Sequence, residues 1–176
     1  MSHPTHPATV HFPITTTLLT GGLDAMYFLS TYAPTSTAVA STFKMLDIAI
    51  PPSMFPILSY YTTILTLLFS APAVATGVYE LMPVIKRDGF SSKKAQVGAL
   101  HALINDVTVV GALYNWWSRR STPGFTPSNE NVLISALVAL PATLFAAYLG
   151  GSLVYVYGMG FGGGQTKAKA RAKKGQ

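Results

Sequence analysis

Two histidines and one glutamate are the residues of this chain whose types suit cofactor or metal chemistry. His11 and His101 offer imidazole nitrogens, and Glu80 offers a carboxylate. Two neutral imidazoles that face each other from different helices suit the axial positions of a b-type haem, with neighbouring polar groups fixing the rings. Glu80, Asn105 or Tyr157 would orient the ligands. The same two histidines with Glu80 also suit a non-haem metal ion.

Three interpretations of these histidines stay open at this point: haem ligands, ligands of another metal ion, and hydrogen-bonded structural residues. His6 is a substitute ligand if the first helix begins early. The chain has no Cys, which excludes iron–sulfur ligation and thiol catalysis. The sequence contains no Walker loop, dinucleotide fingerprint, HExxH or GxSxG motif, so no enzymatic reaction is assigned.

Asp24 and Asp106 are acids inside otherwise apolar stretches. An Asp at the centre of a membrane helix costs about 2.5–3.5 kcal/mol on the insertion scale. No Lys or Arg lies within the expected spans, so each acid must be protonated, hydrogen-bonded, near an interface or paired with a histidine. We expect both side chains to face the interior of a bundle, because lipid offers no hydrogen-bond partner.

The distribution of charge predicts the elements that position these residues. Only 10% of the residues are charged, against about 25% in a soluble domain. No charge interrupts the stretch between Asp47 and Glu80 or that between Glu130 and Lys167, and a membrane-spanning helix needs about 20 apolar residues. We predict an all-α fold, an integral membrane four-helix bundle with spans near residues 10–32, 56–84, 95–117 and 132–158.

The connections divide the chain into one domain and a tail. Residues 1–161 form the four-span domain, and residues 162–176 form a basic tail that is expected to be disordered. The long connection between the first two spans is either a plain loop or carries a short interfacial helix over residues 37–50.

Basic residues gather on one side of the predicted bundle. The loop after the second span and the tail carry nine of them, which are Lys86, Arg87, Lys93, Lys94, Lys167, Lys169, Arg171, Lys173 and Lys174. The opposite side carries Lys44, Arg119 and Arg120. The positive-inside rule places both termini in the cytosol. Topology and anionic lipid explain the net charge of +6, and no nucleic-acid motif accompanies it.

The last four residues, Lys173 to Gln176, match the dilysine pattern that retrieves eukaryotic membrane proteins to the endoplasmic reticulum. Such a signal is an address read by a receptor and has to face the cytosol. An accidental match in a basic tail is the alternative, and the pattern has no meaning in a bacterium.

The predicted topology brings polar residues of all four spans to the cytosolic leaflet. His11 opens the first span and Glu80 closes the second. His101 lies about two turns into the third span, with Asn105 on the same helix face. Tyr157 closes the fourth span. We therefore predict the binding site at this end of the bundle.

The N-terminal sequence His6-Pro7-Ala8-Thr9-Val10-His11-Phe12-Pro13-Ile14 resembles the HPxxVHFPI opening of an uncharacterised membrane family, the domain-of-unknown-function 2231 family. Asp24, Thr76-Gly77, His101 with Asn105, and the glycine-rich end of the fourth span, residues 150–155, are similar to further features of that family. The resemblance implies a compact four-helix membrane domain. Some relatives are fused to cytochrome c or Rieske-type domains, which implies a redox setting. Tyr157 stands where bacterial relatives often have a histidine.

These observations favour a small membrane protein that binds haem b through His11 and His101. One alternative is a non-catalytic membrane subunit or assembly partner of a larger complex. A second is a small transporter that uses Asp24 and Asp106. The expected partners are the lipid bilayer and either other membrane proteins or a second copy of the chain, and nucleic acid is not among them.

Overall fold

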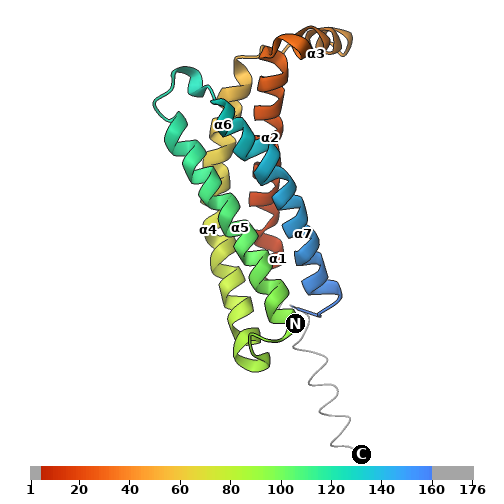
Figure 1. The fold of residues 1–176 in the computed structure, drawn as a ribbon, viewed down its shortest axis with the longest axis vertical. Helices are drawn as coiled ribbons and strands as arrows, with labels where there is room; N and C mark the ends of the chain where they lie inside the picture. Colours follow the sequence, from red (N-terminus) through yellow and green to blue (C-terminus); the bar gives the residue numbers. More distant parts are fainter. Residues whose placement is uncertain (1–4, 160–176) are drawn as a thin grey trace, which may run out of the picture.

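Four long helical segments form the body of the protein. A computed structural model describes residues 5–159, and Figure 1 shows the segments running side by side as an elongated bundle. They are α2 (His11–Thr31), α4 (Met54–Asp88), α5 (Lys93–Arg119), and a composite fourth segment. That segment consists of α6 (Asn129–Val132), the π-helical turn η2 (Leu133–Ala139) and α7 (Leu140–Tyr155). The predicted helical membrane bundle is confirmed.

Three of these segments are long and apolar enough to cross a membrane: Met54–Asp88, Lys93–Arg119 and Asn129–Tyr155. They match the predicted second, third and fourth spans. The predicted first span corresponds to α2, which has 21 residues and lies along α4 in the bundle. A helix satisfies all its own backbone hydrogen bonds, which is the requirement that lipid imposes on a spanning segment.

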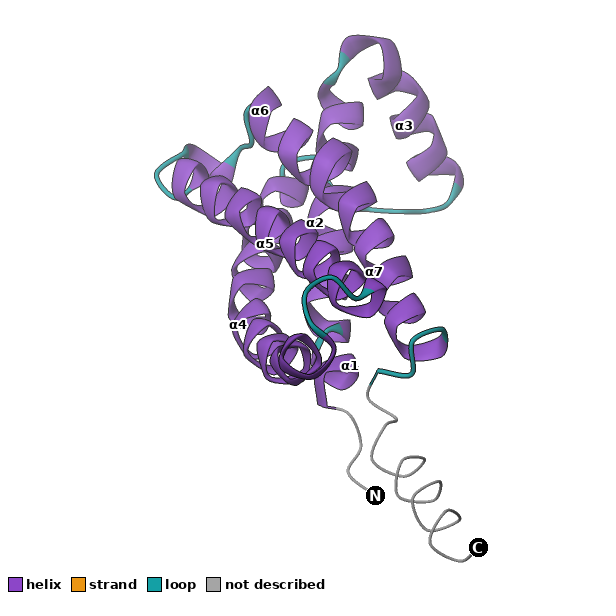
Figure 2. Ribbon diagram, turned by 60° about the horizontal axis from the view of Figure 1, so that its bottom comes forward, coloured by secondary structure: helices purple, strands orange, loops and turns teal. Residues whose placement is uncertain are grey.

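Short helices lie at the two ends of the bundle. α1 (Thr5–Thr9) precedes α2 and packs against α4. α3 (Ala33–Met45) follows α2 and has no buried residue, and Figure 2 shows it set apart from the long helices. The interfacial helix predicted over residues 37–50 is therefore present as a helix but begins earlier, because Pro34 favours a helix start. It ends before Asp47, whose φ is 53°. A short 3₁₀ turn, η1 (Pro123–Phe125), lies between α5 and α6.

The interior of the bundle is unusually polar, and its exterior is apolar. Hydroxyl and amide side chains are buried along the facing sides of the helices; they include Thr16, Thr20, Ser59, Thr63, Thr66, Ser70, Asn115, Asn131, Ser135 and Thr143. Large apolar side chains such as Leu68, Val110 and Leu137 are more than 60% exposed. A lipid surrounding favours this inversion of the soluble pattern, because polar groups can then hydrogen-bond only inside the bundle.

One close backbone approach fixes α2 against η2. A Cβ atom on Gly21 would lie 2.6 Å from the carbonyl oxygen of Ser135. Only glycine fits at such a distance, so Gly21 lets the π-helical turn pack directly on the α2 backbone. The next residue, Gly22, has open space around its Cα.

Candidate functional site

Two histidines from different helices meet near the end of the bundle that holds α1. The His6 ring, on α1, and the His101 ring, on α5, have centroids 6.0 Å apart and planes at 89°. We call His6, Thr76, Glu80, His101 and Asn105 the histidine cluster.

His6 is fixed by α4. Its Nδ1 atom lies 3.0 Å from the Ala73 carbonyl oxygen and 3.2 Å from the Thr76 hydroxyl. Its backbone N–H donates to Glu80 Oε1 at 3.0 Å. Gly77 makes room for the ring, since a Cβ there would lie 3.0 Å from the imidazole Cε1. The position of this ring is thus set by one stretch of α4 that combines Ala73, Thr76, Gly77 and Glu80.

His101 is fixed by α7 in the same way. Its Nδ1 atom lies 2.8 Å from the Ala146 carbonyl oxygen, and a Cβ on Gly150 would lie 3.2 Å from its Cε1. The Asn105 amide nitrogen donates to the His101 carbonyl at 2.7 Å and lies 3.3 Å from the ring Nε2. One helical turn separates His101 from Asn105, so the amide orients the ring from its own helix.

The backbone carbonyls determine which nitrogen of each ring carries the proton. A carbonyl oxygen only accepts hydrogen bonds, so Nδ1 of His6 and Nδ1 of His101 both donate. Each Nε2 atom then holds a lone pair, which is the form of histidine that ligates a metal. Both rings are therefore held in the ligating tautomer by the fold itself.

The separation of the two ring centroids allows both histidines to bind one metal ion. Two imidazoles bound through Nε2 to one metal ion at about 2 Å each place their centroids about 6 Å apart, which is close to the observed separation of 6.0 Å. A non-haem metal ion would lack ligands, because among residues 5–159 no group of three His, Asp or Glu side chains is placed to hold a metal ion.

The structure puts His6, and not His11, opposite His101. His11 begins α2 with an exposed side chain. α1 adds one helical turn before it, and that turn carries His6 to α5. The prediction that His11 pairs with His101 is therefore wrong, whereas the substitute ligand His6 occupies that place. The predicted metal set of His11, His101 and Glu80 is not assembled either.

The other predicted site residues separate into two groups. Glu80 contacts the His6 backbone, and Asn105 contacts His101. Tyr157 lies in the turn after α7, and its side chain makes no hydrogen bond within residues 5–159. Tyr155, one of the two tyrosines at that helix end, is 87% exposed. The fourth span therefore contributes the Ala146 carbonyl and Gly150 to the surroundings of His101 and no tyrosine.

A second polar cluster, centred on Arg119, lies at the opposite end of α5. Arg119 Nη1 lies 3.2 Å from both carboxylate oxygens of Asp24, and the two side chains are 1% and 0% exposed. Ser135 donates to Asp24 Oδ2 at 2.7 Å, and the Ser59 hydroxyl donates to Oδ1. We call Asp24, Ser59, Arg119 and Ser135 the arginine cluster.

The remaining guanidinium nitrogens of Arg119 are also bonded. Nη2 donates to the Pro56 carbonyl at 3.0 Å, and Nε donates to the Phe125 carbonyl at 2.9 Å. The expectation that Asp24 has no basic partner is therefore wrong. The last turn of α5 carries Arg119 to the depth of Asp24, and its long side chain points inward to join separate parts of the chain.

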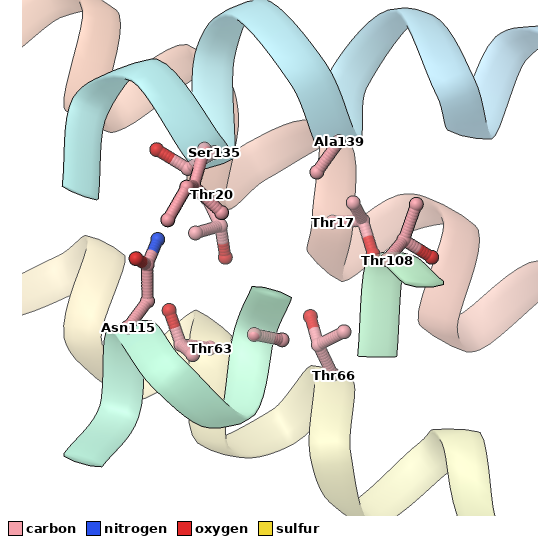
Figure 3. A pocket seen from close by; sticks show the side chains of 10 residues that line it. Thr17, Thr20, Thr63, Thr66, Thr108, Asn115, Ser135 and Ala139 are labelled. Atoms are coloured by element: carbon pink, nitrogen blue, oxygen red, sulfur yellow. The ribbon is translucent and has the colours of Figure 1, made fainter. Parts of the chain in front are cut away.

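A small cavity lies in the polar interior near the arginine cluster (Figure 3). It offers about 20 Å³ of space for the centres of water molecules, which is enough for one or two waters. Its lining is Thr17, Thr20, Thr63, Thr66, Thr108, Ala112, Asn115, Ile134, Ser135 and Ala139. The cavity joins α2, α4, α5 and η2 through hydroxyl groups and is far too small for a cofactor.

Asp106 does not face the interior. Its side chain is exposed on α5, whereas Asn105 and Thr108 on the same helix are turned toward the bundle and partly buried. Neighbouring positions on a helix differ by about 100° in direction, so Asp106 points to the outer face. The prediction of an inward Asp106 is wrong.

The helical bundle, its apolar exterior and its inward-facing polar clusters define a small helical membrane protein. A family model described as "Predicted membrane protein (DUF2231)" matches residues 2–163, so the chain belongs to this membrane family. No curated protein and no solved structure matches the chain.

Proposed function

We propose that this protein binds haem b in the membrane, that His6 and His101 would hold its iron, and that the protein acts in electron transfer. The observation that carries the proposal is the pair of perpendicular imidazoles 6.0 Å apart, each with Nδ1 bonded to a backbone carbonyl. Bound haem would supply a one-electron redox centre.

The chain's own residues would hold and tune such a group. The Ala73 and Ala146 carbonyls accept from the imidazole N–H groups, which increases the electron donation of each Nε2 atom. Gly77 and Gly150 let the rings lie against α4 and α7. Asn105 would give up its long 3.3 Å contact with Nε2 and keep its bond to the His101 carbonyl.

The absorption spectrum of the full-length protein, purified from cells supplied with haem, tests this proposal. We expect a Soret band that is lost in His6→Ala and in His101→Ala and is kept in His11→Ala, the matched control. A colourless wild-type protein that also fails to bind added haemin would contradict the proposal. A Soret band that needs His11 and tolerates His6→Ala would contradict the ligand assignment.

We also infer that both termini face the cytosol, from the asymmetry of basic residues between the two sides of the bundle. The basic tail of residues 162–176, including the dilysine pattern at Lys173 and Lys174, lies outside the described residues. In a eukaryotic cell this pattern would retrieve the protein to the endoplasmic reticulum. Protease added to sealed microsomes should remove a tag placed after Gln176, and protection of the tag would contradict this orientation.

The transporter alternative receives no support from the arrangement of the acids. Asp24 is held in an ion pair with Arg119 and by two serine hydroxyls. Asp106 lies on the outer face of a different helix. The two acids therefore belong to different surroundings and do not line a common path.

A further inference from the structure

Asp106 is an acid on the outside of a membrane helix. It occupies the centre of α5, which runs from Lys93 to Arg119. The side chains around it on this face are apolar and open, with Leu103 60%, Val107 55% and Val110 64% exposed. Among residues 5–159 no side chain is placed to hydrogen-bond its carboxyl group or pair with it. Neither the haem proposal nor the packing of the bundle uses this residue.

The depth of Asp106 makes lipid an unfavourable neighbour. At a rise of about 1.5 Å per residue, the centre of a 27-residue helix lies about 20 Å from either end. An Asp side chain has one methylene group and is too short to reach the headgroups, as a long Lys or Arg side chain does. An Asp at this depth therefore carries an energetic cost in lipid. A partner within the membrane would remove that cost.

Charge complementarity indicates what the partner carries. A basic side chain at the same depth would neutralise the carboxylate and donate hydrogen bonds to it. A second copy of this chain cannot provide one, because the basic residues of the described spans lie at helix ends: Lys86, Arg87, Lys93, Lys94 and Arg119. Of these, Arg119 is already buried against Asp24.

We propose that the outer face of α5, formed by Leu103, Asp106, Val107 and Val110, binds a transmembrane helix of a different protein that carries a Lys or Arg near its middle. The acid selects the partner by charge, and the three apolar side chains provide the packing surface. Such an interface would make this protein one subunit of a larger membrane assembly, and it is independent of haem binding.

A designed probe helix tests this proposal directly. Labelled full-length protein is reconstituted into lipid vesicles with a labelled leucine-rich transmembrane peptide that has one central Arg, and association is followed by energy transfer. The control peptide has Leu at that position. We expect the Arg peptide to associate with the wild type about tenfold more strongly than the control peptide does. Asp106→Asn should abolish this preference, and Leu68→Ala, at an exposed apolar position on α4, should leave it unchanged.

Two results would overturn the proposal. The first is equal association of the Arg and Leu peptides with the wild-type protein, or an Arg preference that survives in Asp106→Asn. The second is energy transfer between two differently labelled copies of the protein that Asp106→Asn abolishes, because the face would then be the contact of a homodimer. The absorption spectrum of Asp106→Asn should equal that of the wild type, which separates this test from that of haem binding.

Discussion

The arginine cluster is a buried polar site and the histidine cluster is a half-buried one, and the two use their hydrogen-bonding capacity differently. In the arginine cluster the carboxylate of Asp24 and all three guanidinium nitrogens of Arg119 have partners within the chain. In the histidine cluster each ring uses Nδ1 on a carbonyl and directs a lone pair from Nε2. A saturated site stabilises the fold, whereas a site in which the Nε2 atom of His101 has only a long 3.3 Å contact with the Asn105 amide is suited to bind. Substitutions should therefore cost stability at one end and binding at the other.

The largest effect is expected for Arg119→Ala. This change leaves the carboxylate of Asp24 buried without its cation, and breaking a buried pair from one side costs about 3–5 kcal/mol. The free energy of unfolding in detergent or mixed micelles measures this loss. The Soret band per folded molecule should stay unchanged, because the histidine cluster lies at the other end of α5.

Arg120→Ala is the matched control for this experiment. Arg120 is exposed and lies 3.3 Å above the Trp117 ring, a contact worth about 0.5–1 kcal/mol at an exposed site. Equal destabilisation by the two substitutions would show that the buried ion pair has no special role.

Gly21→Ala should have the next largest effect. The new methyl group would lie 2.6 Å from the Ser135 carbonyl oxygen, and overpacking of this kind costs about 1–3 kcal/mol. Gly22→Ala, with open space around it, should be neutral or stabilising by up to about 1 kcal/mol, because Ala is the better helix former. Thermal unfolding of the two variants measures the difference. If Gly22→Ala proved as destabilising as Gly21→Ala, the close approach of η2 would not be the cause.

Gly77→Ala tests the same kind of contact at the histidine cluster. Its methyl group would lie 3.0 Å from the Cε1 atom of His6, so the ring has to move by a few tenths of an ångström. A side chain yields more easily than a backbone carbonyl, so we expect a loss of stability below about 1 kcal/mol. The haem content per protein should nevertheless fall severalfold. If Gly77→Ala lost as much stability as Gly21→Ala but kept its haem content, the contact at Gly77 would serve stability and not binding, which would contradict the comparison between the clusters.

The smallest effect on the free energy of unfolding is expected from the protonation of His6. This residue lies in α1, before the long helices. Burial lowers the pKa of His6 below its ordinary value of 6.5, and His101 lowers it further, against the opposing influence of Glu80 and the Ala73 carbonyl. The folded protein therefore favours neutral His6. The resulting stability is fully present above pH 6.5 and is lost as the pH falls through the lower pKa of the folded state.

Unfolding free energies at about pH 7.5 and about pH 5, measured without added haem, check this linkage. His6→Asn should lose less stability on acidification than the wild type does. His11→Asn, at an exposed position, should behave like the wild type, and an equal pH response of both variants would contradict the assignment.

The fold could be predicted from sequence because lipid imposes a simple rule. Two long charge-free stretches and two shorter apolar ones correspond to the four long segments of the structure. The π-helical turn could not be foreseen, since the residues of Leu133–Ala139 are ordinary helix and membrane residues. Its close packing on Gly21 is a tertiary contact that no local pattern indicates.

The site was harder to predict, because it depends on where each helix ends and on which face of the helix points into the bundle. The break after α1 decides between His6 and His11, and both belong to the same short motif. Arg119 stands beside Arg120 at a helix end. In the sequence such a pair resembles the basic residues that flank membrane spans and set their orientation. The available clue was Asp24 itself, since an acid at that depth needs a partner. Among residues 5–159 the basic residues at that end of the bundle are Lys44, Arg119 and Arg120.

The π-helical turn of the fourth segment determines how the part of the helix that contacts the histidine cluster is rotated relative to the part that contacts the arginine cluster. Ser135, within η2, bonds to Asp24, and the Ala146 carbonyl, further along in α7, bonds to His101. A π-helical turn holds one residue more than an α-helical turn, and each added residue rotates the rest of the helix by about 100°. If the same residues were wound as an ordinary α-helix, the extra residue would turn α7 about its axis by about 100°. Ser135 would still bond to Asp24, but the Ala146 carbonyl would point away from His101. The π-helical turn therefore keeps these two contacts of one helix in register.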